Sequence, residues 1–284
     1  RRAVLRTGPR RSDQHKSSFM TTYRFHDVAP RLRRALSIDY VAHDGQRLPP
    51  NHMRYCGSDF RDDAVFLGSG RAEARRLAAE FGMGPQTRVL EIGCGPGRLP
   101  LGILAEQGTI GSYDGVDIDA ASIDWCRRHV TRRHPAFRFH HVEARHERYN
   151  PDGRPMREGF RLEFEDDRFD LVYLHSVFAN MNPDDVSVYC AEFARVLAPE
   201  GRVFLTAFIE EGVPDFTVNP EDYLIESKGP MNVVRYDRDF FFGLVRRAGL
   251  EVARYDHGAD LGGQSLVHLT RAVAPSRGQD GQVF

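Results

Sequence analysis

Val-Leu-Glu-Ile-Gly-Cys-Gly-Pro-Gly-Arg, residues 89–98, is the stretch of the sequence that decides the fold. An apolar segment of strand character runs straight into three glycines, and the pattern that follows is typical of a helix. Glycine permits the positive φ angles of a sharp turn and leaves bare backbone against which a ligand can lie. The first N–H groups of the next helix have no partner within that helix, so this turn can bind a ligand through its backbone.

A carboxylate follows this turn at a meaningful distance. Asp117 ends the next predicted strand, within Gly-Val-Asp-Ile-Asp at 115–119 and twenty residues after Gly97. A carboxylate in this position can accept hydrogen bonds from both ribose hydroxyls of an adenosine. Taken alone, each feature has an ordinary interpretation, a structural glycine turn or a solvated acid. Their combination at two strand ends predicts a nucleoside-binding site.

Outside this region, predicted strands alternate with predicted helices. The helices are expected at 71–83, 100–107, 120–133, 184–197 and 237–248, and the strands at 88–92, 113–118, 137–142, 169–174, 202–208, 250–255 and 265–270. Such alternation predicts an α/β fold in which helices cover both faces of a mostly parallel sheet. Two long insertions, 146–167 and 209–235, interrupt it, and long loops inside a compact domain are usually functional.

The spacing of the glycines indicates which nucleoside cofactor to expect. Dinucleotide sites use G-x-G-x-x-G/A, whose small last residue allows tight packing of helix on strand. Here that position is Arg98, and the glycines follow G-x-G-x-G. Glu91, just before the turn, would also repel a pyrophosphate, whereas it suits a cation such as the amino group of a methionine moiety.

Four motifs in this order resemble those of the class I S-adenosylmethionine-dependent methyltransferases. They are Glu-Ile-Gly-Cys-Gly-Pro-Gly at 91–97, Val-Asp-Ile-Asp at 116–119, Phe-Asp-Leu-Val at 169–172 and Arg-Val-Leu-Ala-Pro-Glu-Gly-Arg at 195–202. The resemblance extends over residues 70–271. It implies a Rossmann-like, doubly wound, seven-stranded sheet that is mostly parallel, with the last strand antiparallel, and seven strands are predicted above.

The resemblance also implies a set of residues that bind S-adenosylmethionine. These are Glu91, Gly93, Cys94, Gly95, Gly97, Asp117, Ile118, Glu143, Ala144 and Leu174. The glycines would hold the methionine and ribose part, with Glu91 near its amino end, while Asp117 would bind the ribose hydroxyls. Ile118 would cover one face of the adenine, and Glu143 would meet the adenine amino group. Ordinary core packing for Ile118 and a surface position for Glu143 remain the alternatives.

A weaker similarity concerns the segment before the sheet, Leu48–Gly57 together with Phe66–Arg71. It looks like the corresponding region of a bacterial methyltransferase group that often accompanies glycosyltransferases. This similarity favours a hydroxyl of a sugar, glycolipid or other small molecule as the acceptor. It also implies that Arg54 and Tyr55 reach the carboxylate end of the cofactor, and a plain amphipathic lid is the alternative.

An O-methyltransferase gains from a base beside the methyl group, and His175 is the candidate nearest in sequence. It ends the fourth predicted strand and is followed by Ser-Val-Phe at 176–178. The Asn/Asp-Pro-Pro-Tyr/Phe motif of N6-adenine or glutamine methyltransferases is missing there. Further side chains that could line the acceptor pocket are Asn180, Tyr236, Asp237, His257 and Gln264.

The charge and composition of the sequence limit the cellular compartment and the binding partners to expect. Residues 1–34 hold ten Lys or Arg against two Asp, a net charge of +8, which leaves −9 for the rest of a chain whose total is −1. No segment is apolar enough to span a membrane, and four scattered cysteines fit a reducing cytoplasm. We expect a small-molecule acceptor rather than a nucleic acid, no metal from the histidines at 140, 141 and 146, and leave a homodimer open.

The predicted organisation has four parts. Residues 1–34 form a basic extension, 35–70 a lid segment, 71–271 the catalytic domain and 272–284 a tail. Met20 could be the natural start, which would make residues 1–20 an added or disordered stretch. The alternatives kept open are an RNA methyltransferase that uses the basic extension, an N- or C-methyltransferase, a nicotinamide-dependent oxidoreductase and a cofactor-binding protein without catalysis.

Overall fold

The computed structural model describes residues 39–272, apart from 56, 157–158, 222 and 225–228. The predictions for residues 1–34 and for the tail beyond residue 272 lie outside these residues. The compact unit that follows begins at Tyr40.

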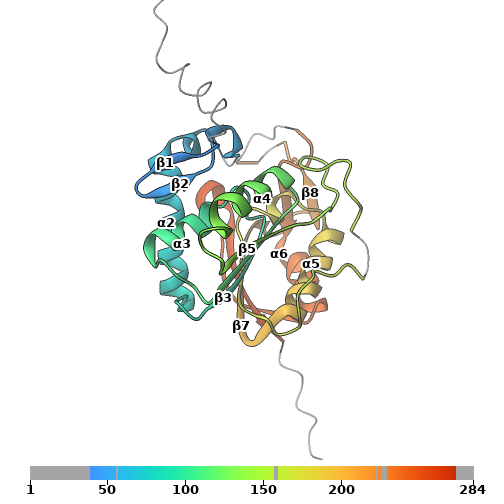
Figure 1. Ribbon diagram of the computed structural model, residues 1–284. Helices are drawn as coiled ribbons and strands as arrows, with labels where there is room; N and C mark the ends of the chain where they lie inside the picture. The colour runs from blue at the N-terminus through green and yellow to red at the C-terminus, as the bar shows by residue number, and fades with distance from the viewer. Residues whose placement is uncertain (1–38, 56, 157–158, 222, 225–228, 273–284) are drawn as a thin grey trace, which may run out of the picture. The chain divides into compact units, whose positions relative to one another are not determined.

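Seven strands form the main sheet in the order β10-β11-β7-β6-β3-β4-β5, which runs through the centre of Figure 1. Their bounds are β3 Arg88–Ile92, β4 Ser112–Asp117, β5 Phe137–His141, β6 Phe169–Leu174, β7 Leu197–Glu210, β10 Leu250–Asp256 and β11 Ser265–Arg271. The pairs from β7 through β6, β3 and β4 to β5 are parallel, and β11 is antiparallel to both of its neighbours. The predicted mostly parallel sheet with an antiparallel last strand is confirmed, and two further strands beside β7 bring the described sheet to nine strands.

Helices cover the two faces of this sheet (Figure 1). The helices α2 (Asp63–Phe81), α3 (Arg98–Glu106) and α4 (Ala120–Cys126) pack on one face, and α5 (Pro183–Val196) and α6 (Arg238–Arg247) on the other. Successive strand residues alternate between the two cores, because side chains alternate across a strand. Val89 and Tyr173 join the first core, for example, and Leu90 and Val172 the second.

The start of α2 differs from the sequence prediction. A helix was expected from residue 71, but α2 begins at Asp63, where the Asp62 side chain accepts a hydrogen bond from the Val65 N–H. The sequence predicts that residues 63–70 belong to the lid segment. Gly70 instead allows the backbones of two helices to meet: a Cβ there would lie 2.3 Å from the carbonyl oxygen of Arg98 in α3. The helix therefore crosses the boundary predicted at residue 70.

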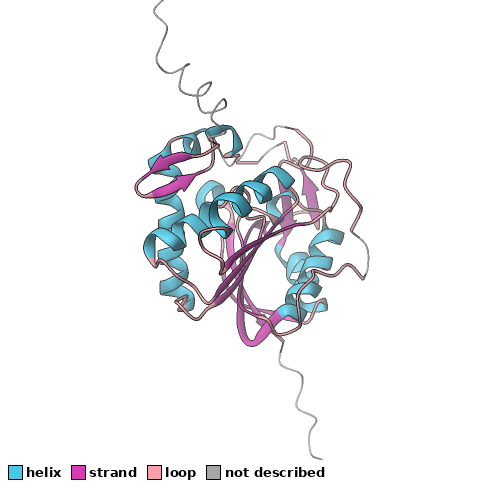
Figure 2. Ribbon diagram, viewed as in Figure 1, coloured by secondary structure: helices cyan, strands magenta, loops and turns pink. Residues whose placement is uncertain are grey.

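Several elements were not predicted at all. A hairpin of β1 (Val41–His43) and β2 (Gln46–Leu48) precedes two 3₁₀ turns, Asn51–Met53 and Ser58–Arg61. The second insertion contains β8 (Phe216–Val218) and ends in β9 (Val234–Asp237), which pairs with β7 (Figure 2). The helix expected to reach residue 133 ends at Cys126 and continues as a π-turn, Arg127–Thr131.

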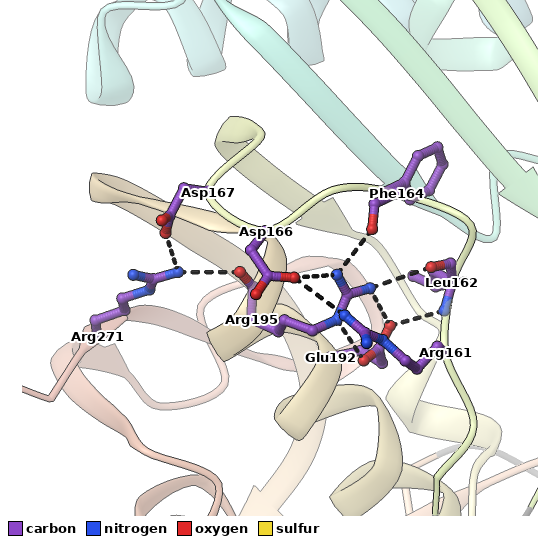
Figure 3. Close-up of polar contacts among 8 residues, drawn as sticks. All are labelled: Arg161, Leu162, Phe164, Asp166, Asp167, Glu192, Arg195 and Arg271. Carbon is purple, nitrogen blue, oxygen red and sulfur yellow. Dashed lines mark hydrogen bonds and ion pairs between the residues drawn. The ribbon is translucent and has the colours of Figure 1, made fainter.

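The end of the first insertion is fastened to α5 by one arginine (Figure 3). Arg195 donates to the carbonyl oxygens of Leu162 and Phe164, at 3.1 and 2.8 Å, and to both oxygens of the buried Glu192. Glu192 in turn accepts from the Leu162 N–H at 2.7 Å. Because Arg195 supplies several parallel donors, one side chain fixes the path of the chain into β6.

Candidate functional site

The site lies where the strand order reverses. Strand β3 is flanked by β4, which follows it in sequence, and by β6, which comes much later. In an open α/β sheet, ligands bind at the carboxyl ends of the strands at such a switch point. The glycine loop follows β3 here, and the segment with His175 follows β6. The two segments touch, since a Cβ on Gly93 would lie 2.5 Å from Cγ2 of Val177.

The glycine loop has the backbone that its sequence predicts. Gly93, Gly95 and Gly97 have φ angles of 73°, 50° and 90°, which residues with a Cβ rarely adopt. The N–H groups of Gly93 and Cys94 both donate to the carbonyl oxygen of Val116, at 2.8 and 3.2 Å. No atom of the described residues lies within 4 Å of the position that a Cβ on Gly95 would occupy. The loop therefore leaves open space over bare backbone, as a cofactor cradle requires.

Asp117 connects the glycine loop to the end of β4. Its Oδ2 accepts from the Gly95 N–H at 2.7 Å and its Oδ1 from the Asp119 N–H at 2.8 Å. Burial raises the pKa of Asp117 above its ordinary value. Each carboxylate oxygen has a further lone pair, so both can still accept a hydroxyl. The structure thus orients Asp117 as a two-point acceptor beside the loop.

Glu91 is buried, only 5% exposed, on the face of the sheet that α2 and α3 cover. The Tyr113 hydroxyl donates to its Oε2. Burial raises the pKa of Glu91 to about 8, although the Tyr113 hydrogen bond and the positive charge of Arg98 both favour the ionised form. A carboxyl group that is neutral at pH 7 beside the loop can ionise when a cation approaches it.

The two lid residues have different surroundings. Arg54 is 4% exposed, and its guanidinium donates to the carbonyl oxygens of Pro49 and Phe60 and pairs with Asp63 at 2.8 Å. Tyr55 is 58% exposed, and its hydroxyl donates to Asp119 Oδ2 at 3.1 Å. Partial burial and the Asp119 carboxylate raise the pKa of Tyr55 to about 12. Arg54 therefore fastens the lid segment to α2, whereas Tyr55 lies over the end of β4.

The other predicted cofactor residues are placed less uniformly. Leu174 is fully buried in the core under α5 and α6, so only its backbone borders the site. Cys94 is buried too, close enough to Gly115 that a Cβ there would lie 2.9 Å from Sγ. Ile118 is half-buried, and its carbonyl oxygen is 3.2 Å from Nε2 of His141. At the end of β5, Glu143 is exposed and Ala144 is buried.

The segment after β6 joins His175 to groups from the far end of the chain. Its Nε2 lies 2.9 Å from Asp260 Oδ2, and its Nδ1 lies 3.3 Å from Ser176 Oγ. Ser176 Oγ accepts from Gln264 Nε2 at 2.7 Å, and Gln264 Oε1 accepts from the Thr206 hydroxyl at 2.7 Å. Sequence reasoning named His175 and Gln264 but missed Asp260 and Thr206, because no motif connects these distant positions.

The remaining acceptor candidates have structural partners. Asn180 donates to the carbonyl oxygen of Met231 at 3.2 Å and so ties the two insertions to the end of β6. The buried Tyr236 hydroxyl donates to the carbonyl oxygen of Met181. Asp237 caps α6 through the N–H groups at its start, and His257 pairs with Glu210 at 2.9 Å. None of these four contacts by itself indicates a ligand.

Histidines 140, 141 and 146 do not share one partner. His140 lies 2.8 Å from Asp114, His141 lies 3.2 Å from the Ile118 carbonyl, and His146 contacts the Asn180 carbonyl at 2.7 Å. Within the described part of the chain, no three His, Cys, Asp or Glu side chains are gathered as a metal ion would need. No helix among the described residues is both long and apolar enough to cross a bilayer.

Comparison with known proteins agrees with this geometry. Residues 89–201 match the model of a family described as a methyltransferase domain. The fold is similar to that of the PH0226 protein from Pyrococcus horikoshii (17% identity, 78% of this chain and 95% of that chain, TM-score 0.50). It is also similar to the [4+2]-cyclase SpnF (14%, 87% and 93%, 0.52).

A third similar structure is a chain from the Haloferax volcanii complex that contains the Trm112 methyltransferase activator (16%, 73% and 98%, 0.50). At these identities the solved structures establish the fold alone, and the family match identifies a methyltransferase domain at residues 89–201. The matched residues contain the glycine loop, Asp117 and the end of β6. Residues 89–201 therefore form a methyltransferase domain, and this match supports an enzyme that uses S-adenosylmethionine as its cofactor.

Proposed function

We propose that the protein transfers the methyl group of S-adenosylmethionine to a hydroxyl of a small molecule or saccharide. One observation carries this proposal: Val177 packs against Gly93, so the segment with His175 borders the cofactor loop directly. When bound, S-adenosylmethionine supplies a methyl group that is already activated by the positive sulfonium. What the protein must add is alignment and, for a hydroxyl acceptor, a base.

The cofactor site is assigned from the open backbone around Gly95 and from the two acids beside it. Asp117 would accept the ribose hydroxyls with the lone pairs that Gly95 and Asp119 leave unused. Glu91 would ionise toward the ammonium group of the methionine part. Tyr55, held over Asp119, would cover the adenosine end rather than the carboxylate end.

The remaining residues would act mainly through shape and backbone. Ile118 and Glu143 lie at the ends of β4 and β5, where the adenine would extend. Arg54 we keep as a residue that positions Tyr55, because its donors are used within the lid segment. The lid segment and the two insertions would select the acceptor, since they border the strand ends without belonging to the cofactor loop.

His175 is the proposed base. Its side chain is 27% exposed, so solvent or an acceptor can reach it, and it adjoins the cofactor loop through Ser176 and Val177. A base that takes the hydroxyl proton in the transition state contributes roughly 10²- to 10⁴-fold to the rate.

An assay of methyl transfer tests this function. The protein is mixed with methyl-labelled S-adenosylmethionine and a panel of simple phenols and methyl glycosides, and products are examined by mass spectrometry. We expect methylation at oxygen and a fall in kcat of roughly 10²-fold or more in His175→Ala. Transfer only to nitrogen or carbon, or a cyclisation without methyl transfer, would contradict the proposal, and near-full turnover in His175→Ala would exclude His175 as the base.

A further inference from the structure

The imidazole of His175 lies between an acid and a hydroxyl. Nε2 is 2.9 Å from Asp260 Oδ2, and Nδ1 is 3.3 Å from Ser176 Oγ. The negative charge of the Asp260 carboxylate at this distance favours the ring proton on Nε2, although the contact is an ion pair and not a well-aligned hydrogen bond. Nδ1 then carries the lone pair and faces Ser176. The position of Asp260 thus decides which ring nitrogen of His175 can act as a base.

The direction of the hydrogen bonds on the other side of Ser176 is also determined. The Ser176 N–H donates to Thr206 Oγ1 at 2.8 Å, and the Thr206 hydroxyl donates to Gln264 Oε1 at 2.7 Å. This fixes the orientation of the Gln264 amide, whose Nε2 donates to Ser176 Oγ at 2.7 Å. Because Ser176 Oγ already accepts from Gln264, its own proton is directed to Nδ1 of His175. The side-chain hydrogen bonds therefore run in one direction, from Thr206 through Gln264 and Ser176 to His175, whose other ring nitrogen faces Asp260.

Among the residues of this network, His175 and the adjacent Ser176 are the ones that an acceptor can reach. Thr206 is fully buried, Gln264 is 7% exposed, and the Asp260 side chain is 14% exposed against 27% for His175. Ser176 is half-buried next to His175 and has a φ of 59°, unusual for a residue with a side chain. Strained backbone of this kind persists where the surroundings hold it, and it is common at active sites.

From these contacts we infer that Asp260 is a positioning residue for His175 and that the Ser176 hydroxyl relays the proton of the methyl acceptor to Nδ1. The inference rests on the proposed O-methyl transfer. The acceptor proton passes to Ser176 Oγ while the proton of Ser176 passes to Nδ1. A lone pair of the acceptor oxygen forms the new bond to carbon, and the electrons of the broken S–CH₃ bond stay on sulfur. The imidazolium that results is paired with Asp260 and later returns its proton to water.

The position of the ring proton can be measured without any acceptor. ¹⁵N NMR of the full chain labelled at histidine reports which nitrogen carries the proton, and His175→Gln identifies the signal. In the wild type we expect the proton of neutral His175 on Nε2. In Asp260→Asn the carboxamide can donate to Nε2, so the proton should move to Nδ1. A wild-type ring protonated on Nδ1, or an unchanged ring in Asp260→Asn, would overturn the inference.

Kinetics supply the second test. With the phenol or methyl glycoside that the wild type methylates, we expect Asp260→Asn and Ser176→Ala to lower kcat by about 10²-fold, while KM for S-adenosylmethionine changes little. Glu80→Gln is the matched control, because it removes a carboxylate 3.6 Å from another histidine, His268, and should leave kcat unchanged. Methylation of none of the probes would overturn the proposed function. Methylation with an unchanged kcat in Asp260→Asn would overturn the proton relay alone.

Discussion

Backbone groups form one half of the site, and side chains form the other. After β3 and β4, the backbone forms the site, and Asp117 joins the N–H groups of Gly95 and Asp119 over a short stretch of chain. After β6 and β7, side chains form it, and the hydrogen bond from Gln264 to Ser176 joins residues 88 positions apart. The first half depends on local conformation, whereas the second exists only when β10 and β11 have folded onto β7.

Under the proposed function, this difference separates the cofactor site from the acceptor site. The glycine loop and Asp117 tolerate few substitutions, because no other residue type has the shape of a glycine or of that carboxylate. The side-chain half can change residue by residue without disturbing the cradle. One fold can thus keep its cofactor site and accept different substrates.

The largest effect should come from the backbone half. In Asp117→Ala we expect the affinity for S-adenosylhomocysteine, measured by calorimetric titration, to fall roughly 10²- to 10⁴-fold. The estimate counts two lost hydrogen bonds to a charged group, each about 1.5–3 kcal/mol. Asp124→Asn, an exposed acid on α4, is the control and should bind normally. An unchanged affinity in Asp117→Ala would mean that the ribose lies elsewhere.

The contact between the halves should have an intermediate effect, on stability. Gly93→Ala imposes a left-handed conformation on a residue with a Cβ and drives that atom to 2.5 Å from Val177. We expect the free energy of unfolding in urea to fall by about 3 kcal/mol. Adding Val177→Ala should recover the steric part but not the conformational part. If the two substitutions are simply additive, the halves do not meet at this contact.

Counted per pH unit, the smallest effect concerns Glu91. Its pKa is raised by burial from 4.5 to about 8, so between these values the folded protein holds a proton that the unfolded chain has released. The free energy of unfolding should therefore fall as pH rises through this window, by at most about 1.4 kcal/mol per pH unit from this group. Glu91→Gln should remove that contribution. Equal slopes for wild type and variant across the window would show that Glu91 is ionised when folded.

Much of the first half could be predicted from the sequence, because the residues that form it lie close together along the chain. The spacing of Gly93, Gly95, Gly97 and Asp117 is local, and the structure gives these glycines the expected positive φ angles. The mostly parallel sheet with helices on both faces also followed from the alternation of predicted strands and helices. The start of α2 did not, because Gly70 serves a close helix contact that only the folded chain reveals.

The second half could not be predicted to the same depth. His175 was named from its place after a strand, but its partner Asp260 lies in a connection that carries no motif. Arg195 was recognised only as part of a motif, although its donors hold the first insertion to α5 (Figure 3). The functional prediction for Arg54 stays untested, and its contacts within the lid segment follow from folding rather than from spacing.

The glycine contact between α2 and α3 has a mechanical consequence. A Cβ on Gly102 would lie 2.1 Å from the carbonyl oxygen of Gly70, so the two helices meet backbone to backbone with no deformable side chain between them. The ion pair between Arg54 and Asp63 holds the lid segment to α2. The same helix packs against Arg98, the first residue of α3. A hinge motion between α2 and α3 would have to separate tightly packed backbone, whereas the Tyr55 ring can move by side-chain rotation alone. With Tyr55 placed over the adenosine end as proposed, exchange of spent cofactor would need rotation of that ring and no movement of the whole lid segment.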